Sequence, residues 1–286
     1  MRVGSGDFQF EPVENWERGP AGRPFGGIVP AMATDSRDRV YIARRDPAAI
    51  LVYASDGRYL ESWGEDVFHN PHSVWISPED QIYIADVDDH TVRCCSTAGQ
   101  VLQTWGTPGR TGAPGEPFNK PTWAVRSEAG ELFVADGYGQ FRVHRFAADG
   151  ALLCSWGTEG SGPGQFALPH CLRLDSRGRV LAIDRENGRI QHFDVDGNYL
   201  GEWSDLGAPN DIFIDADDHV FIAEGERRIS VLDLDGKVLD RWGEEGDAPG
   251  QFADHPHGIW LDSSGDLYIA EVPYINDRLQ KFKRIR

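Results

Sequence analysis

The chain has 286 residues, enough to bury one large core or two ordinary ones, and its 40% hydrophobic content is typical of a globular protein. Its 28 lysines and arginines against 46 aspartates and glutamates give a net charge of −18, which argues against a nucleic-acid backbone or an anionic membrane as partner. No run of about 18 apolar residues occurs, so the sequence predicts no membrane-spanning helix.

The cysteines and the N-terminus indicate the compartment. Two of the four cysteines, Cys94 and Cys95, are adjacent and would point to opposite faces of a strand. This pattern, with Cys154 and Cys171 elsewhere, favours reduced thiols over a disulfide framework. The first ten residues lack the charged and then apolar segments of a signal peptide. We therefore expect a cytoplasmic protein.

A repeat of roughly 35–45 residues runs through the whole chain. The consensus unit begins with a proline and an apolar strand, continues with two further strands, and passes through an Asp-Gly turn to a strand ending in Trp-Gly. Four short strands joined by such turns are typical of a propeller blade, and helical periodicity is absent. The sequence therefore predicts an all-β, six-bladed β-propeller, whose copies begin at Pro30, Pro71, Pro121, Pro169, Pro209 and Pro256.

The sixth copy ends with the chain after only three strands. The N-terminal segment 8–16 ends in Trp16, as the fourth strands of the other copies end in tryptophan. We predict that this segment completes the sixth blade and leaves no open sheet edge. The Gly/Pro-rich stretches 107–117, 158–165 and 243–251 each precede a new copy, so they are interpreted as inter-blade loops of one domain spanning 1–286.

The residue that follows the opening proline alternates in kind. In chain order it is Ala31, His72, Thr122, His170, Asn210 and His257. Because the first strand of each blade lines a propeller's channel, the histidines of copies two, four and six should lie about 120° apart on one ring. A lone histidine is usually a hydrogen-bonding group, but three in alternation favour a metal site with open positions for water or substrate. Zinc suits imidazole ligands best, and iron, nickel or copper would also fit.

A second ring is expected where the second strands end. Five copies carry an acid there, at Asp86, Asp136, Asp184, Glu224 and Glu271, so these acids are interpreted as turn-capping parts of the repeat. Two copies differ from the others here. The first has Arg44 and Arg45 in place of an acid, and the third continues after its acid through Gly137 to Tyr138. An arginine and a tyrosine near the histidines would suit an anionic substrate and a proton transfer.

At these residues the chain resembles propellers of the NHL type and, among them, peptidyl-α-hydroxyglycine α-amidating lyase and its bacterial relatives. The resemblance extends over nearly all six copies. It is carried by Ala85-Asp86-Val87 with His90, by Val134-Ala135-Asp136-Gly137-Tyr138, and above all by Pro169-His170 with the segment 184–191. The resemblance implies a lyase that splits the C–N bond of an α-hydroxyglycine to give an amide and glyoxylate.

The resemblance also implies roles for particular residues. His72, His170 and His257 would hold a catalytic zinc, and Tyr138 would be the catalytic base. Arg45 would be the catalytic arginine that binds the substrate carboxylate, with Arg44 as its nearest alternative and Arg185 as a further substrate-binding residue. One departure concerns calcium: Gly258 stands where the family has an aspartate that helps to bind a structural Ca²⁺, and Asn210 and Asp211 are the alternative donors.

Two other functions stay open at this stage. A metal-dependent hydrolase or lactonase would use the same histidines, with Tyr138 as a hydrogen-bond donor. A non-catalytic NHL scaffold would leave the histidines without a chemical role. For the enzymes we expect a small-molecule or short peptide-like substrate and a monomer or small homo-oligomer.

Overall fold

The computed structural model describes residues 1–17, 25–272 and 278–285. Apart from two short 3-10 helices, η1 (Gly6–Phe8) and η3 (Arg185–Asn187), the regular elements of this part of the chain are β-strands. They form six four-stranded sheets and one two-stranded sheet. The chain is thus an all-β, six-bladed β-propeller, as the repeat predicts. No helix within the described ranges has the length and apolarity that a membrane crossing requires.

The fold divides into two compact units, each with three of the four-stranded sheets. One unit comprises residues 67–209 and the other residues 1–66 with 210–286. The prediction of a single domain over 1–286 stays a prediction.

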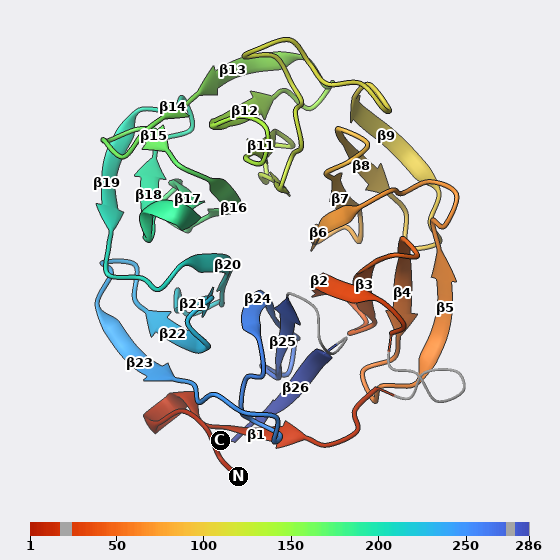
Figure 1. Cartoon of the computed structure of the whole chain (residues 1–286), viewed down its shortest axis with the longest axis vertical. Coiled ribbons are helices and arrows are strands. Elements are labelled where there is room, and N and C mark those ends of the chain that lie inside the picture. Colours follow the sequence, from red (N-terminus) through yellow and green to blue (C-terminus); the bar gives the residue numbers. More distant parts are fainter. Residues whose placement is uncertain (18–24, 273–277, 286) are drawn as a thin grey trace. The chain divides into compact units, whose positions relative to one another are not determined.

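The unit of 67–209 holds the sheets of copies two, three and four. Figure 1 shows these sheets side by side, with the fourth strands β9, β13 and β19 on the outside. Their strands are β6 (Pro71–Ile76), β7 (Ile82–Asp86), β8 (Thr91–Cys95) and β9 (Val101–Gly106); β10 (Trp123–Arg126), β11 (Leu132–Asp136), β12 (Arg142–Phe146) and β13 (Leu152–Trp156); and β16 (Pro169–Leu174), β17 (Val180–Asp184), β18 (Arg189–Phe193) and β19 (Tyr199–Trp203).

The unit of 1–66 and 210–286 holds the sheets of copies five, six and one. Their strands are β20 (Pro209–Ile214), β21 (Val220–Glu224), β22 (Arg228–Leu232) and β23 (Val238–Trp242); β24 (His255–Leu261), β25 (Leu267–Val272), β26 (Arg278–Arg284) and β1 (Phe10–Val13); and β2 (Ile28–Thr34), β3 (Val40–Arg45), β4 (Ala49–Tyr53) and β5 (Tyr59–Trp63).

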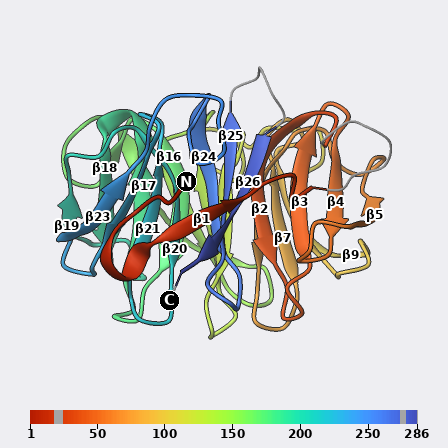
Figure 2. The same ribbon diagram turned by 90° about the horizontal axis from the view of Figure 1, so that it is seen from below.

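The N-terminal strand completes the sixth sheet, as the sequence predicts. β1 pairs antiparallel with β26, from Phe10 opposite Arg284 to Val13 opposite Lys281, and Figure 2 shows the two strands side by side. The strand is shorter than the predicted 8–16. Trp16 lies beyond its end, where the buried indole donates a hydrogen bond of 2.9 Å to the carbonyl of Ser55.

Burial follows the position of a strand within its sheet. The second strands, such as β7 and β11, are buried at every position. The fourth strands expose most of their residues. Between the sheets of copies two and three, Tyr83, Val92, Phe118, Val134 and Phe146 form one apolar cluster. Burying each large side chain contributes about 1.5–3 kcal/mol.

One of the predicted inter-blade loops contains regular structure. Two short strands, β14 (Thr158–Glu159) and β15 (Gln165–Phe166), pair in parallel within the segment 158–166. The Gly/Pro-rich composition that predicts a loop also allows the chain to fold back sharply and form this pair.

A buried histidine of copy four should make stability depend on pH. His192 on β18 is 5% exposed, its Nε2 has no hydrogen-bond partner among the residues that the structure describes, and its ring packs edge-on against Trp203 at 4.4 Å. Burial, with a smaller contribution from the charge of Arg179, lowers the pKa of His192 from 6.5 to about 4. The stability that this neutral imidazole contributes is therefore complete above pH 6.5 and is lost as the pH falls toward 4.

On lowering the pH from 7 to about 4.5, the wild type should lose about 2 kcal/mol more unfolding free energy than His192→Gln does. The reason is that glutamine has no proton to take up on unfolding. Denaturant titrations of both proteins at the two pH values measure this difference. An unchanged difference would show that His192 titrates as it does in the unfolded chain.

Candidate active site

In several copies, the side chain of the residue after the opening proline forms a hydrogen bond to the next copy. Thr122 Oγ1 donates to the carbonyl of Pro169 at 2.9 Å, within the unit of 67–209. Asn210 Nδ2 donates to the carbonyl of Pro256 at 2.9 Å, within the other unit. In both cases the side chain ties its own copy to the first strand of the next copy.

Histidines perform the same task with one ring nitrogen. His72 Nδ1 lies 2.8 Å from the carbonyl oxygen of Thr122, and His257 Nδ1 lies 2.8 Å from that of Pro30. A carbonyl oxygen can only accept, so each Nδ1 carries a proton, and in the neutral imidazole each Nε2 then carries a lone pair. Unlike threonine or asparagine, these histidines therefore offer a second, basic atom.

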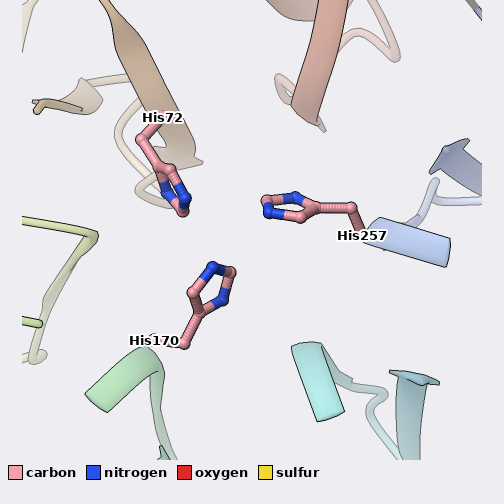
Figure 3. Close-up of side chains that lie close together, drawn as sticks. All are labelled: His72, His170 and His257. Atoms are coloured by element: carbon pink, nitrogen blue, oxygen red, sulfur yellow. The ribbon is translucent and has the colours of Figure 1, made fainter. Parts of the chain in front are cut away.

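Two of the predicted ligands meet in the unit of 67–209. His72 and His170 are both buried, and each is the second residue of its strand, β6 or β16. Their ring centroids lie 4.8 Å apart and candidate ligand nitrogens lie within 4.8 Å of each other; Figure 3 shows the two imidazoles facing one another. His257, on β24 of the other unit, is also buried.

Tyr138 lies beside both predicted ligands of this unit. Its hydroxyl is 3.0 Å from His72 Nε2 and 3.3 Å from His170 Nε2. Because His72 Nε2 carries the lone pair, the hydroxyl donates to it. The tyrosine side chain is 39% exposed, so a substrate in solution can reach it.

The Asp-Gly-Tyr motif is explained by a close backbone approach. A Cβ on Gly137 would lie 1.9 Å from the carbonyl oxygen of Pro169, a distance that no side chain can adopt. Glycine therefore allows the turn between β11 and β12 to approach the first strand of the next copy. This approach brings Tyr138 to the two histidines.

The ring of acids has the structural role that the repeat predicts. Asp86 accepts hydrogen bonds from the backbone of His69 and Asn70 at 2.7 and 2.9 Å, just before the strand that carries His72. In the same way Asp184 accepts from the backbone of Ala167 and Leu168, just before His170. Such buried acids fix the segments that lead into the ligand-bearing strands.

The three predicted arginines differ in their surroundings. Arg44 donates to the backbone carbonyls of Pro47 and Phe25 at 2.8 and 3.2 Å, so its guanidinium is engaged in holding the loop after β3. Arg45 is the half-buried last residue of β3. Arg185 lies in the unit of Tyr138, with its guanidinium 5.9 Å from the tyrosine ring centroid and paired with Glu186 at 2.9 Å.

The glycine at the calcium-related position also has a local cause. A Cβ on Gly258 would lie 2.8 Å from the carbonyl oxygen of Pro30, the group that orients His257. Asp211, an alternative donor, is buried and accepts from the backbone of Ile212 and Ile259 at 2.7 and 3.0 Å. A calcium site stays a prediction.

Comparison with known proteins shows the family. An NHL repeat profile matches residues 166–193. The NHL repeat-containing protein 3 of Mus musculus is 32% identical over 279 residues, which cover 87% of this chain and 78% of that protein. The chain belongs to the NHL repeat family. The match to the human counterpart, also 32% identical, covers 56% of that protein.

Other relatives of this NHL repeat protein are enzymes. Peptidyl-alpha-hydroxyglycine alpha-amidating lyase 1 of Drosophila melanogaster is 32% identical over 160 residues, which cover 52% of this chain and 30% of that protein. The relationship to amidating lyases that the motifs indicate is thereby confirmed. A streptogramin B lyase structure matches 98% of both chains with a TM-score of 0.69 at 13% identity, a likeness that shows the fold alone.

Sequence reasoning missed the partners that orient these side chains. The carbonyls of Thr122 and Pro30 accept from His72 Nδ1 and His257 Nδ1 and so orient the two rings. Every residue has a backbone carbonyl, so the sequence does not indicate which ones act as partners. A signal was nonetheless present: threonine, asparagine and histidine, the residues after proline in copies two to six, can all donate a hydrogen bond.

Proposed function

We propose that this NHL repeat protein is a metal-dependent lyase that cleaves the C–N bond of an α-hydroxyglycine-type substrate. The products would be an amide and glyoxylate. His72, His170 and His257 would hold the metal, Tyr138 would transfer the proton, and Arg45 and Arg185 would bind the substrate carboxylate. Zinc is the first choice of metal.

One observation supports this proposal above the others. Thr122 and Asn210 tie neighbouring copies together as well as His72 and His257 do. The repeat therefore does not need histidine for this bond, and histidine adds a second ring nitrogen, which in His72 lies 3.0 Å from the Tyr138 hydroxyl. Metal-binding histidines commonly donate their other ring nitrogen to a backbone carbonyl, so this donor set fits a transition-metal ion.

When bound, such a metal would supply Lewis-acid stabilisation of negative charge on a substrate oxygen. The protein's own residues would orient the substrate. A guanidinium binds a carboxylate with two parallel hydrogen bonds, which fixes the reacting carbon relative to Tyr138. Arg185 stands over the tyrosine ring, where it could provide this contact.

The proposed reaction needs no co-reactant, because all atoms of the substrate appear in the two products. As general base, Tyr138 would remove the hydroxyl proton of the α-hydroxyglycine. The oxygen then forms the aldehyde C=O bond of glyoxylate as the C–N bond breaks, and the electron pair of that bond stays on nitrogen. Tyr138 passes the proton to that nitrogen, which gives the neutral amide and returns the tyrosine to its starting state.

Product analysis tests this function. The zinc-loaded protein is incubated at neutral pH with N-benzoyl-α-hydroxyglycine, and benzamide and glyoxylate are quantified against a protein-free control. We expect both products in equal amounts. Opening of a simple lactone without glyoxylate would indicate the hydrolase, and no conversion of either compound would indicate a scaffold.

A further inference from the structure

A cavity of about 410 Å³ adjoins the turn that carries Tyr138, within the unit of 67–209. One wall is the chain that continues directly from the tyrosine, and the others come from the loop after β9 and from residues 157–159, which follow β13. The lining residues of interest are Gly115, Asn119, Gln140, Arg142, Thr158 and Glu159.

Arg142 departs from the repeat. The arginines at the same position in three other copies, Arg189, Arg228 and Arg278, each form an ion pair with the acid that ends the second strand of their own copy. Among the residues that the structure describes, Arg142 forms no ion pair with any acid.

The acid of copy three is occupied by other donors. Asp136 receives His144 Nε2 at 3.2 Å, Gln140 Nε2 at 3.0 Å and the backbone N–H of Asn119 at 2.9 Å. His144 stands two residues after Arg142 on β12, at the position from which Gln191, Ser230 and Gln280 contact the acids of their own copies. The guanidinium of Arg142 does not join these donors and lines the cavity beside Gly115.

The walls of the cavity are held in place by side chains. Gln140 Oε1 accepts from the backbone of Gly115 at 2.8 Å, and its Nε2 donates to the carbonyl of Glu116 at 2.7 Å. Asn119 Nδ2 donates to the carbonyl of Gly139 at 3.1 Å, one residue beyond Tyr138. The cavity is therefore a formed site, fastened to the same turn as Tyr138.

We propose that this cavity binds the part of the substrate remote from the reacting carbon, and that Arg142 recognises a carboxylate there. The ligand class is an acidic residue on the N-terminal side of the α-hydroxyglycine. Glu159, exposed on another wall, is not ion-paired with Arg142, so the positive charge stays available to a ligand. This inference rests on the proposed function for the identity of the reacting group, but not for the binding of the carboxylate.

Calorimetric titration with two blocked amino acids tests the cavity by itself. The probes are N-acetylglutamate methylamide and the uncharged N-acetylglutamine methylamide, applied to the wild type, Arg142→Gln and Glu159→Gln. We expect the wild type to bind the glutamate form about tenfold more tightly, because a charge-assisted hydrogen bond exceeds a neutral one.

Arg142→Gln should lose this preference, whereas Glu159→Gln should keep or increase it, because a like charge has been removed. Equal binding of both probes by the wild type, or a preference that survives in Arg142→Gln, would overturn the inference. Thermal unfolding of both variants near the wild-type temperature confirms that the fold is intact.

Turnover separates this inference from the proposed function. Glyoxylate release is measured from N-acetyl-Glu-α-hydroxyglycine and N-acetyl-Gln-α-hydroxyglycine. We expect kcat/KM to favour the glutamate peptide about tenfold in the wild type and not in Arg142→Gln. No glyoxylate from either peptide would contradict the proposed lyase, whereas equal release from both would contradict only the role of the cavity.

Discussion

Replacement of Tyr138 by phenylalanine is expected to slow glyoxylate release by at least about a hundredfold, because the variant lacks the only group assigned to move the substrate proton. The ring remains, so its packing against His72 at 5.2 Å and beneath Arg185 should persist. The measurement is kcat and KM with N-benzoyl-α-hydroxyglycine. The loss should fall on kcat, since the substrate carboxylate is bound by other residues.

Tyr199→Phe provides the matched control. This tyrosine is 36% exposed on β19 of the same unit, and its hydroxyl donates to Glu202 at 3.1 Å. Its removal should leave kcat unchanged. A Tyr138→Phe protein with the wild-type rate would exclude the tyrosine as the proton-transfer group.

The second large effect is expected from His72→Asn. Asparagine at this position can donate to the carbonyl of Thr122, as Asn210 does to that of Pro256, but it offers no imidazole Nε2. Activity should fall by at least about a hundredfold through loss of a metal ligand. The unfolding free energy, in contrast, should stay within about 1 kcal/mol of the wild type measured without metal.

His72→Ala separates the two nitrogens of the same ring. The alanine variant should lose activity equally, but it also leaves the buried carbonyl of Thr122 without this donor, which costs about 1–3 kcal/mol in unfolding free energy. Denaturant titration of the two variants, both stripped of metal, measures that difference. Full activity in His72→Asn would show that the histidine serves only the carbonyl bond.

Most of the fold could be predicted because the same residue types recur at the same places in each copy of the repeat. The apolar second strands, the Asp-Gly turns and the closing tryptophans recur at fixed spacing, and a sixth copy with only three strands implies a fourth strand from another part of the chain, which is β1. The end of β1 could not be placed, because Trp16 resembles the strand-ending tryptophans but packs against Tyr53 and Tyr268 outside the strand. The parallel pairing of β14 and β15 depends on the path of a loop and has no periodic signal.

The candidate site divides in the same manner. His72 and His170 could be selected because they occupy the same place in alternate copies, and Tyr138 because it follows the second strand of copy three only. The structure places their side chains together in the unit of 67–209. The position of Arg142 was not predictable, because the arginines at the same place in three other copies pair with the acid of their own copy. Whether such a pair forms is decided by side-chain geometry.

The proposed function requires that the alternating histidines bind a metal and that the reaction depends on it. The most direct measurement is the metal content of the purified protein by plasma mass spectrometry, before and after dialysis against a chelator, with glyoxylate release followed in parallel. We predict about one transition-metal ion per chain, lost together with activity on dialysis and regained with zinc. A metal-free protein that releases glyoxylate at an undiminished rate would contradict the claim.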